Sequence, residues 1–170
     1  MLYILTKQKN QLVTISPNDL DIFQECDKAF DKKNVEYSIN LLQPDESISV
    51  RTRAVCILAD IGNEEVIPVL SEILKNDKTS LVRHEAAFTL GQLGCAQSVP
   101  ALIDAMLSDS NNVVRHESAV ALGSIGDQSA RNALINATND NDKLVVHSAF
   151  SSLLNLDHLQ LNLKTKLQRN

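Results

Sequence analysis

Two histidine–glutamate pairs are the residues of this chain best suited to chemistry. The pairs His84-Glu85 and His116-Glu117 stand 32 positions apart. Imidazole and carboxylate together suit non-haem iron or another mid-series divalent metal, and the lack of cysteine in the motif argues against a closed structural zinc site. Each pair also falls near an expected helix N-terminus, where the helix dipole favours the neutral imidazole that binds a metal. The alternative is that duplication of a repeat copied two ordinary polar residues.

A repeat of 32 residues supplies the elements that would position the two pairs. Residues 50–62 align with residues 82–94, and these align with residues 114–126, while a weaker copy, offset by 31, covers residues 145–156. Each copy carries apolar residues at helical spacing and is followed by a second amphipathic segment. Neither helix of a unit can bury its apolar stripe alone. The repeat therefore predicts an all-α solenoid, built as a right-handed stack of antiparallel helix pairs.

Capping residues mark the ends of the expected helices. Polar residues precede the first helices, glycines follow them, and prolines stand where a second helix begins and a missing N–H costs nothing. The residues are Ser80 and Asn112 as N-caps, Gly94 and Gly126 after the last helical turn, and Pro68 and Pro100 at the second helices.

An aspartate and an arginine recur six residues apart in three units. A register of this kind predicts a ladder of carboxylates and guanidinium groups between neighbouring repeats, although solvated charges would show the same spacing. The aspartates are Asp45, Asp77 and Asp109, and the arginines are Arg51, Arg83 and Arg115.

A helical wheel places the histidines away from the core. With Val82 at zero and about 100° per residue, the core stripe centres at about 35° and His84 lies at about 200°. Adjacent helices of one layer lie roughly 8–10 Å apart, so that pairs in register can converge. An apolar side chain and a glycine are expected beside each histidine, which together would form an open contact surface for a partner or substrate. These residues are Phe88 and Gly91 in one unit and Val120 and Gly123 in the next.

The repeat resembles known families. Val-Arg-His-Glu-Xaa-Ala followed by Leu-Gly-Xaa-Leu/Ile-Gly, over residues 44 to 157, resembles HEAT-like repeats of the phycobilisome-lyase type. The stretches 79–94 and 113–127 also resemble one half of deoxyhypusine hydroxylase. That resemblance implies a di-iron centre in which each half contributes two His-Glu pairs, matched here by His84-Glu85 and His116-Glu117. Because the chain carries only two pairs, a complete centre of that kind would need two chains.

The chain divides into three segments on this interpretation. Residues 1–43 form an N-terminal cap, in which residues 2–15 alternate like a short β-hairpin and a degenerate helical repeat follows. Residues 44–157 hold the repeats, in units that start near positions 48, 80, 112 and 143. Residues 158–170 form a polar C-terminal tail.

Composition narrows the function classes. A net charge of −5 without a basic stripe disfavours nucleic acid, no apolar run is long enough for a membrane span, and three unpaired cysteines suit the reducing cytoplasm. Three functions remain open. The first is a protein-binding or assembly module, in which metal binding is an added property. The second is an iron-dependent, monooxygenase-like hydroxylase completed by homodimerisation. The third, a phycobilin-lyase-like chaperone of a tetrapyrrole carrier, has no marker of its own in the sequence.

Overall fold

The computed structural model describes residues 15–167, with side chains up to residue 162. All the regular elements in this range are helical, which confirms the all-α prediction. The expected hairpin of residues 2–15 lies almost wholly outside the described residues. No helix in the described range is both long and apolar enough to cross a membrane.

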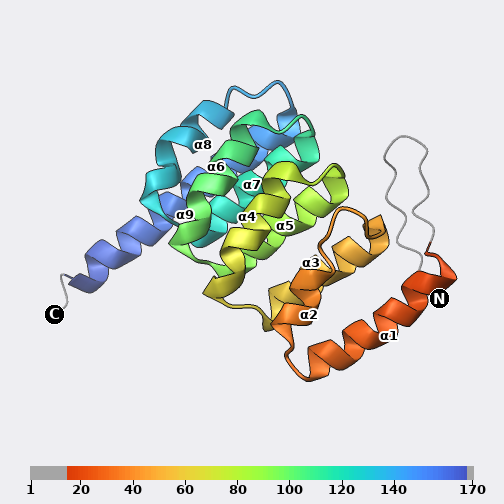
Figure 1. The fold of residues 1–170 in the computed structure, drawn as a ribbon. Coiled ribbons are helices and arrows are strands. Elements are labelled where there is room, and N and C mark those ends of the chain that lie inside the picture. The colour runs from red at the N-terminus through yellow and green to blue at the C-terminus, as the bar shows by residue number, and fades with distance from the viewer. Residues whose placement is uncertain (1–14, 168–170) are drawn as a thin grey trace.

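The helices form two layers, stacked in chain order (Figure 1). In the first layer α3, α5, α7 and α9 pack side by side, and α4, α6 and α8 form the second layer against them. The N-terminal helices α1 and α2 pack on α3. The bounds are α1 Pro17–Asp31, α2 Val35–Asn40, α3 Ile48–Ile61, α4 Ile67–Asn76, α5 Ser80–Leu93, α6 Val99–Ser108, α7 Asn112–Ile125, α8 Arg131–Ala137 and α9 Lys143–Leu167, with 3-10 turns at Glu64–Val66, Ala96–Ser98 and Gln128–Ala130.

The core lies between the two layers. One leucine from each of α3, α5 and α7 and one from each second-layer helix is fully buried at repeat-equivalent positions, because each helix turns its apolar stripe toward the other layer. The leucines are Leu58, Leu90 and Leu122 in the first layer and Leu70, Leu102 and Leu134 in the second.

The N-caps of α5 and α7 lie one residue earlier than predicted. Ser80 and Asn112 are the first helical residues, and the caps are Thr79 and Asn111. Both caps have extended backbones, and the Asn111 side chain accepts a hydrogen bond from the amide of Val113. The prediction was wrong because neighbouring polar residues compete for the cap position and backbone geometry decides between them.

The predicted glycine and proline signals are confirmed. Gly94 and Gly126 end α5 and α7 with φ of 68° and 73°, in the left-handed region that a side chain rarely adopts. Pro68 and Pro100 lie in the first turns of α4 and α6, where the missing N–H would have no helical partner.

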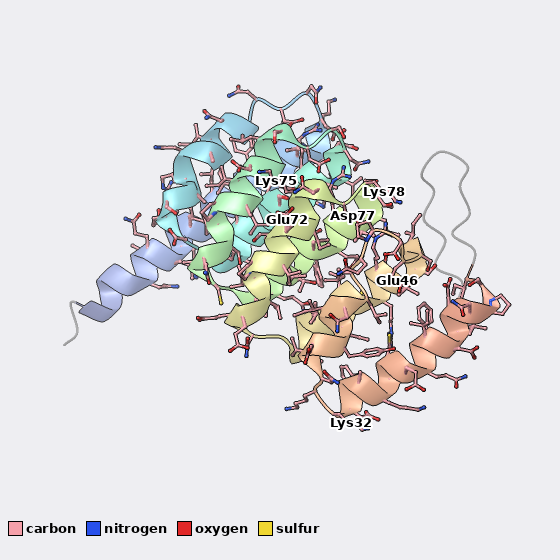
Figure 2. The ribbon with its side chains drawn as sticks, viewed as in Figure 1. Lys32, Glu46, Glu72, Lys75, Asp77 and Lys78 are labelled. Carbon is pink, nitrogen blue, oxygen red and sulfur yellow. The ribbon has the colours of Figure 1, made fainter. Side chains whose placement is uncertain are left out.

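Three largely buried ion pairs, one at the end of each of the first three units, form a ladder of carboxylates and guanidinium groups as predicted. Each arginine bonds to the aspartate before the next first-layer helix, with Nε–Oδ2 distances of 2.8, 2.7 and 2.9 Å, and also donates to a backbone carbonyl before its own helix. The aspartate of the first pair, Asp77, lies at the turn between α4 and α5 (Figure 2). Asp140 takes the place of the predicted Asp45, because each arginine pairs with the aspartate that follows its helix and not with the one that precedes it. The pairs are Arg51–Asp77, Arg83–Asp109 and Arg115–Asp140.

The last first-layer helix, α9, carries larger side chains than α7 on the surface where α7 contacts the next helix. In α7, Ala119 and Gly123 are buried, and Gly123 packs against Ser152 of α9. The repeat-equivalent residues of α9 are Phe150 and Leu154, and both are exposed. Large apolar side chains therefore stand where the earlier unit has small residues.

The ladder predicts unequal costs for two arginine substitutions. The Arg51 side chain is 1% exposed, so Arg51→Met leaves the buried Asp77 carboxylate without its cation. We expect a loss of about 3–5 kcal/mol in the free energy of unfolding, measured by urea denaturation. The control is Arg131→Met, which breaks the exposed pair with Asp157 and should cost about 0–1 kcal/mol. Equal losses in the two variants would show that the ladder does not stabilise the stack.

Candidate metal centre

The two histidine–glutamate pairs lie on the neighbouring first-layer helices α5 and α7, and three of their four side chains converge between these helices. His84 of α5 lies between two carboxylates: its Nδ1 is 3.4 Å from Oε1 of Glu85, and its Nε2 is 3.3 Å from Oε2 of Glu117 on α7. All three side chains are largely buried, with His84 26% exposed. The contact between His84 and Glu117 links the two pairs directly.

The charge of His84 follows from this position. The carboxylates of Glu117 and then Glu85 raise the pKa of His84 from 6.5 to about 9, against the opposing effect of burial. The ring is therefore an imidazolium at neutral pH, although it lies near a helix N-terminus, where a neutral ring was expected. Two carboxylates at close range outweigh the helix dipole. Within the described residues, Nδ1 of this ring is buried without a hydrogen-bond partner, because Glu85 lies beyond good bonding geometry.

His116 has a different environment, although it occupies the same place in its unit. Its Nδ1 lies 2.5 Å from Oγ of Ser148 on α9. Burial lowers the pKa of His116, so that its ring is neutral at neutral pH. Sequence reasoning did not select Ser148, although the repeat register was a sufficient signal: Ser148 occupies in unit four the place of Glu117 in unit three.

Cys56 of α3 is a second residue that sequence reasoning missed. Its thiol donates to Oε2 of Glu85 at 3.7 Å, and burial together with this carboxylate raises the pKa of Cys56 to about 11. The thiol is therefore protonated at neutral pH and is a poor nucleophile. Cys56 stands in unit one where Phe88 stands in unit two, and an aromatic counterpart gave no signal for a polar contact.

The exposed part of the predicted contact surface consists of Phe88 and Val120. Their side chains are 44% and 37% exposed. Phe88 borders a shallow pocket of about 240 Å³ between α3 and α5. This pocket is lined by Cys56, Ala59, Asp60, Glu85, Phe88 and Gln92.

The two glycines of that predicted surface lie elsewhere. A Cβ on Gly91 would stand 2.7 Å from Cβ of Ala121, and one on Gly123 would stand 2.7 Å from Cβ of Ser152. Both glycines therefore let neighbouring first-layer helices approach closely, and they do not form the floor of an open groove. The wheel was wrong here because it measures direction from the core and contains no neighbouring helix.

The donor atoms of the two pairs are of the kinds that bind a divalent metal. Their arrangement within one chain is not that of a metal site. Two imidazoles and two carboxylates are ligands of non-haem iron. However, within the described part of the chain no group of three or more His, Cys, Asp or Glu side chains is placed to hold a metal ion. His84 occupies the space between the two carboxylates, and His116 turns one nitrogen to Ser148.

The raised pKa of His84 predicts a pH-dependent contribution to stability. The folded pKa, about 9, exceeds the ordinary value of 6.5, so the ion pairs stabilise the fold fully below pH 6.5 and are lost as the pH rises through 9. His84→Gln should therefore cost most at pH 6 and progressively less by pH 9.5, measured by urea unfolding. His147→Gln, at the exposed equivalent position of unit four, is the control and should show no such trend. A His84→Gln cost that is constant with pH would contradict the ion-pair assignment.

Comparison with known proteins agrees with the geometry of the repeats. A family model described as HEAT repeats matches residues 29–87 and 68–154. The structure of human deoxyhypusine hydroxylase in complex with glycerol is similar, with a TM-score of 0.68 and 33% sequence identity over 74% of this chain. The match covers 44% of the hydroxylase, so this chain spans less than half of that protein's length. A search of curated proteins found no match.

The matched ranges include the helices that carry both histidine–glutamate pairs and all three ladder arginines. They extend from the end of α1 into α9, which is well over half of the chain. This chain belongs to the HEAT-repeat family.

Proposed function

We propose that the two histidine–glutamate pairs form half of a non-haem metal centre, completed by the same residues of a second copy of the chain. The main support is the convergence of Glu85 and Glu117 on His84. No lysine or arginine in the described residues pairs with either carboxylate, so the imidazolium is their counter-cation. A divalent metal could take over this role if the ring released its proton.

A second copy is needed because one chain does not supply enough converging ligands. Each chain offers two imidazoles and two carboxylates, and one imidazole already contacts the neighbouring helix through Ser148. A two-fold dimer is the commonest homo-oligomer and places a surface against its own copy. Carboxylates that face one another without a cation would repel, so metal binding and dimerisation should strengthen each other.

Iron is the metal that the motif resemblance to deoxyhypusine hydroxylase implies. Iron bound at such a site would supply oxygen activation for a hydroxylation. The residues of this chain would hold the metal, and the pocket beside Phe88, with Asp60 and Glu85 in its wall, would bind a substrate that carries positive charge.

Ferrous iron should convert the chain from monomer to dimer. We expect anaerobic sedimentation of the wild type to give twice the monomer mass with iron and the monomer mass without it, because the linked equilibria require both metal and pairing. His84→Ala/His116→Ala should stay monomeric and bind no iron in metal analysis. His147→Ala, which removes an exposed histidine outside the site, should behave as the wild type. A wild type that stays monomeric and metal-free in iron would exclude the proposed centre.

The second candidate function is protein binding through the open face of the first layer. The exposure of Phe88 and Val120 on neighbouring helices favours it, because an aromatic and an aliphatic side chain side by side suit a docking surface. On this alternative the histidine–glutamate pairs only connect α5 to α7.

Replacing Phe88 with a charged residue distinguishes protein binding from the proposed metal centre. Phe88→Asp should keep the helix content measured by circular dichroism, because the side chain is exposed, and should lose bound proteins in quantitative affinity capture. Leu107→Asp is the matched control, since Leu107 is equally exposed but lies on α6 in the other layer. Identical captured sets for both variants and the wild type would exclude the open face as the binding surface.

A further inference from the structure

The hydroxyl of Ser148 has two hydrogen-bond neighbours that together determine its role. Its Oγ lies 2.9 Å from the carbonyl oxygen of Leu144, one turn earlier in α9, and 2.5 Å from Nδ1 of His116. A carbonyl oxygen can only accept, and a hydroxyl has a single proton. The proton of Ser148 is therefore donated to Leu144, and the oxygen lone pair faces the ring.

This direction of the hydrogen bonds assigns the tautomer of His116. Because Ser148 accepts, Nδ1 of His116 must be the donor and carry the hydrogen. When the ring is neutral, its second nitrogen, Nε2, then has the unprotonated lone pair. Nε2 is then the nitrogen of this ring that can bind a metal without first losing a proton.

His84 shows what happens when the next unit supplies a different residue. At the place equivalent to Ser148, unit three has Glu117, and this carboxylate lies against Nε2 of His84 while Glu85 lies near Nδ1. Carboxylates near both ring nitrogens favour the doubly protonated ring of His84, although Nδ1 makes no hydrogen bond within the described residues. The two histidines are equivalent by sequence, but the residue that follows on the neighbouring helix makes only one of them a ready ligand.

We propose that Ser148 is a positioning residue, which holds His116 in the Nδ1–H tautomer and leaves Nε2 as its metal-binding atom. Ser148 is 7% exposed, and its hydroxyl is fixed by the α9 backbone, so water does not compete freely for the contact. Buried partners of this kind orient ligand rings and fix their tautomer in metal sites. This inference rests on the proposed metal function for its purpose, but the tautomer itself exists without metal.

The tautomer is measured by long-range ¹⁵N–¹H correlation spectra of histidine-labelled, metal-free protein at a pH where His116 is neutral. We expect the wild type to show protonated Nδ1 and bare Nε2 at His116. Ser148→Ala should lose this preference and Ser148→Thr, which keeps the hydroxyl, should restore it. Ser152→Ala is the control: it removes another buried hydroxyl from α9, one that donates to the carbonyl of Ala119 and does not contact His116. Its spectrum at His116 should match that of the wild type.

A wild-type ring protonated at Nε2, or a Ser148→Ala spectrum unchanged from the wild type, would overturn the assignment. Cobalt(II) titration then tests the consequence, and Ser148→Ala should bind about 10–100-fold more weakly than the wild type and Ser152→Ala. Equal cobalt affinities would overturn the positioning role. If the wild type binds no cobalt, the metal function fails, and the spectra still decide the tautomer on their own.

Discussion

The buried arginine–aspartate pair between consecutive units is the interaction on which the rest of the structure depends. Each guanidinium bonds a carboxylate in the turn that ends its own unit and a carbonyl in the turn before its own helix, so it fixes the spacing of consecutive turns along the stack. Arg83 and Arg115 stand immediately before His84 and His116. The ladder therefore also sets the register in which each histidine reaches its neighbouring helix, and a slip of one residue would separate His84 from Glu117.

The repeat made the fold predictable because its period carries both helices of every unit. Apolar spacing located the buried leucines, and glycine and proline located several helix ends, since these signals act within one helix and its core contact. The exact N-caps were not predictable, because Thr79 and Ser80 have similar capping chemistry. The pairing of Arg115 with Asp140 escaped the six-residue rule, because unit four has Val146 at the position where the other units have the arginine.

The sequence was sufficient to predict which residues belong to the candidate site. It was not sufficient to predict the contacts that their side chains make. The sequence singled out His84 and His116 together, yet one is charged between carboxylates and the other is neutral beside a serine. A single-helix wheel contains no neighbouring helix, and for this reason it assigned Gly91 to the open face instead of the contact with α7. The contacts of side chains between units depend on the residues of both neighbouring units. An argument from the sequence of one unit therefore could not predict them.

The exposed large side chains of α9 have a consequence for any helix that would pack beside it with the spacing of the earlier units. Ala119 and Gly123 admit the next first-layer helix at close range, whereas Phe150 and Leu154 occupy the equivalent surface of α9. A further helix with the same spacing would meet two large side chains, where α7 and α9 each meet an alanine methyl group and a glycine hydrogen atom. Lengthening the solenoid by placing a copy of an earlier unit directly against α9 would therefore require these two positions to be made small first.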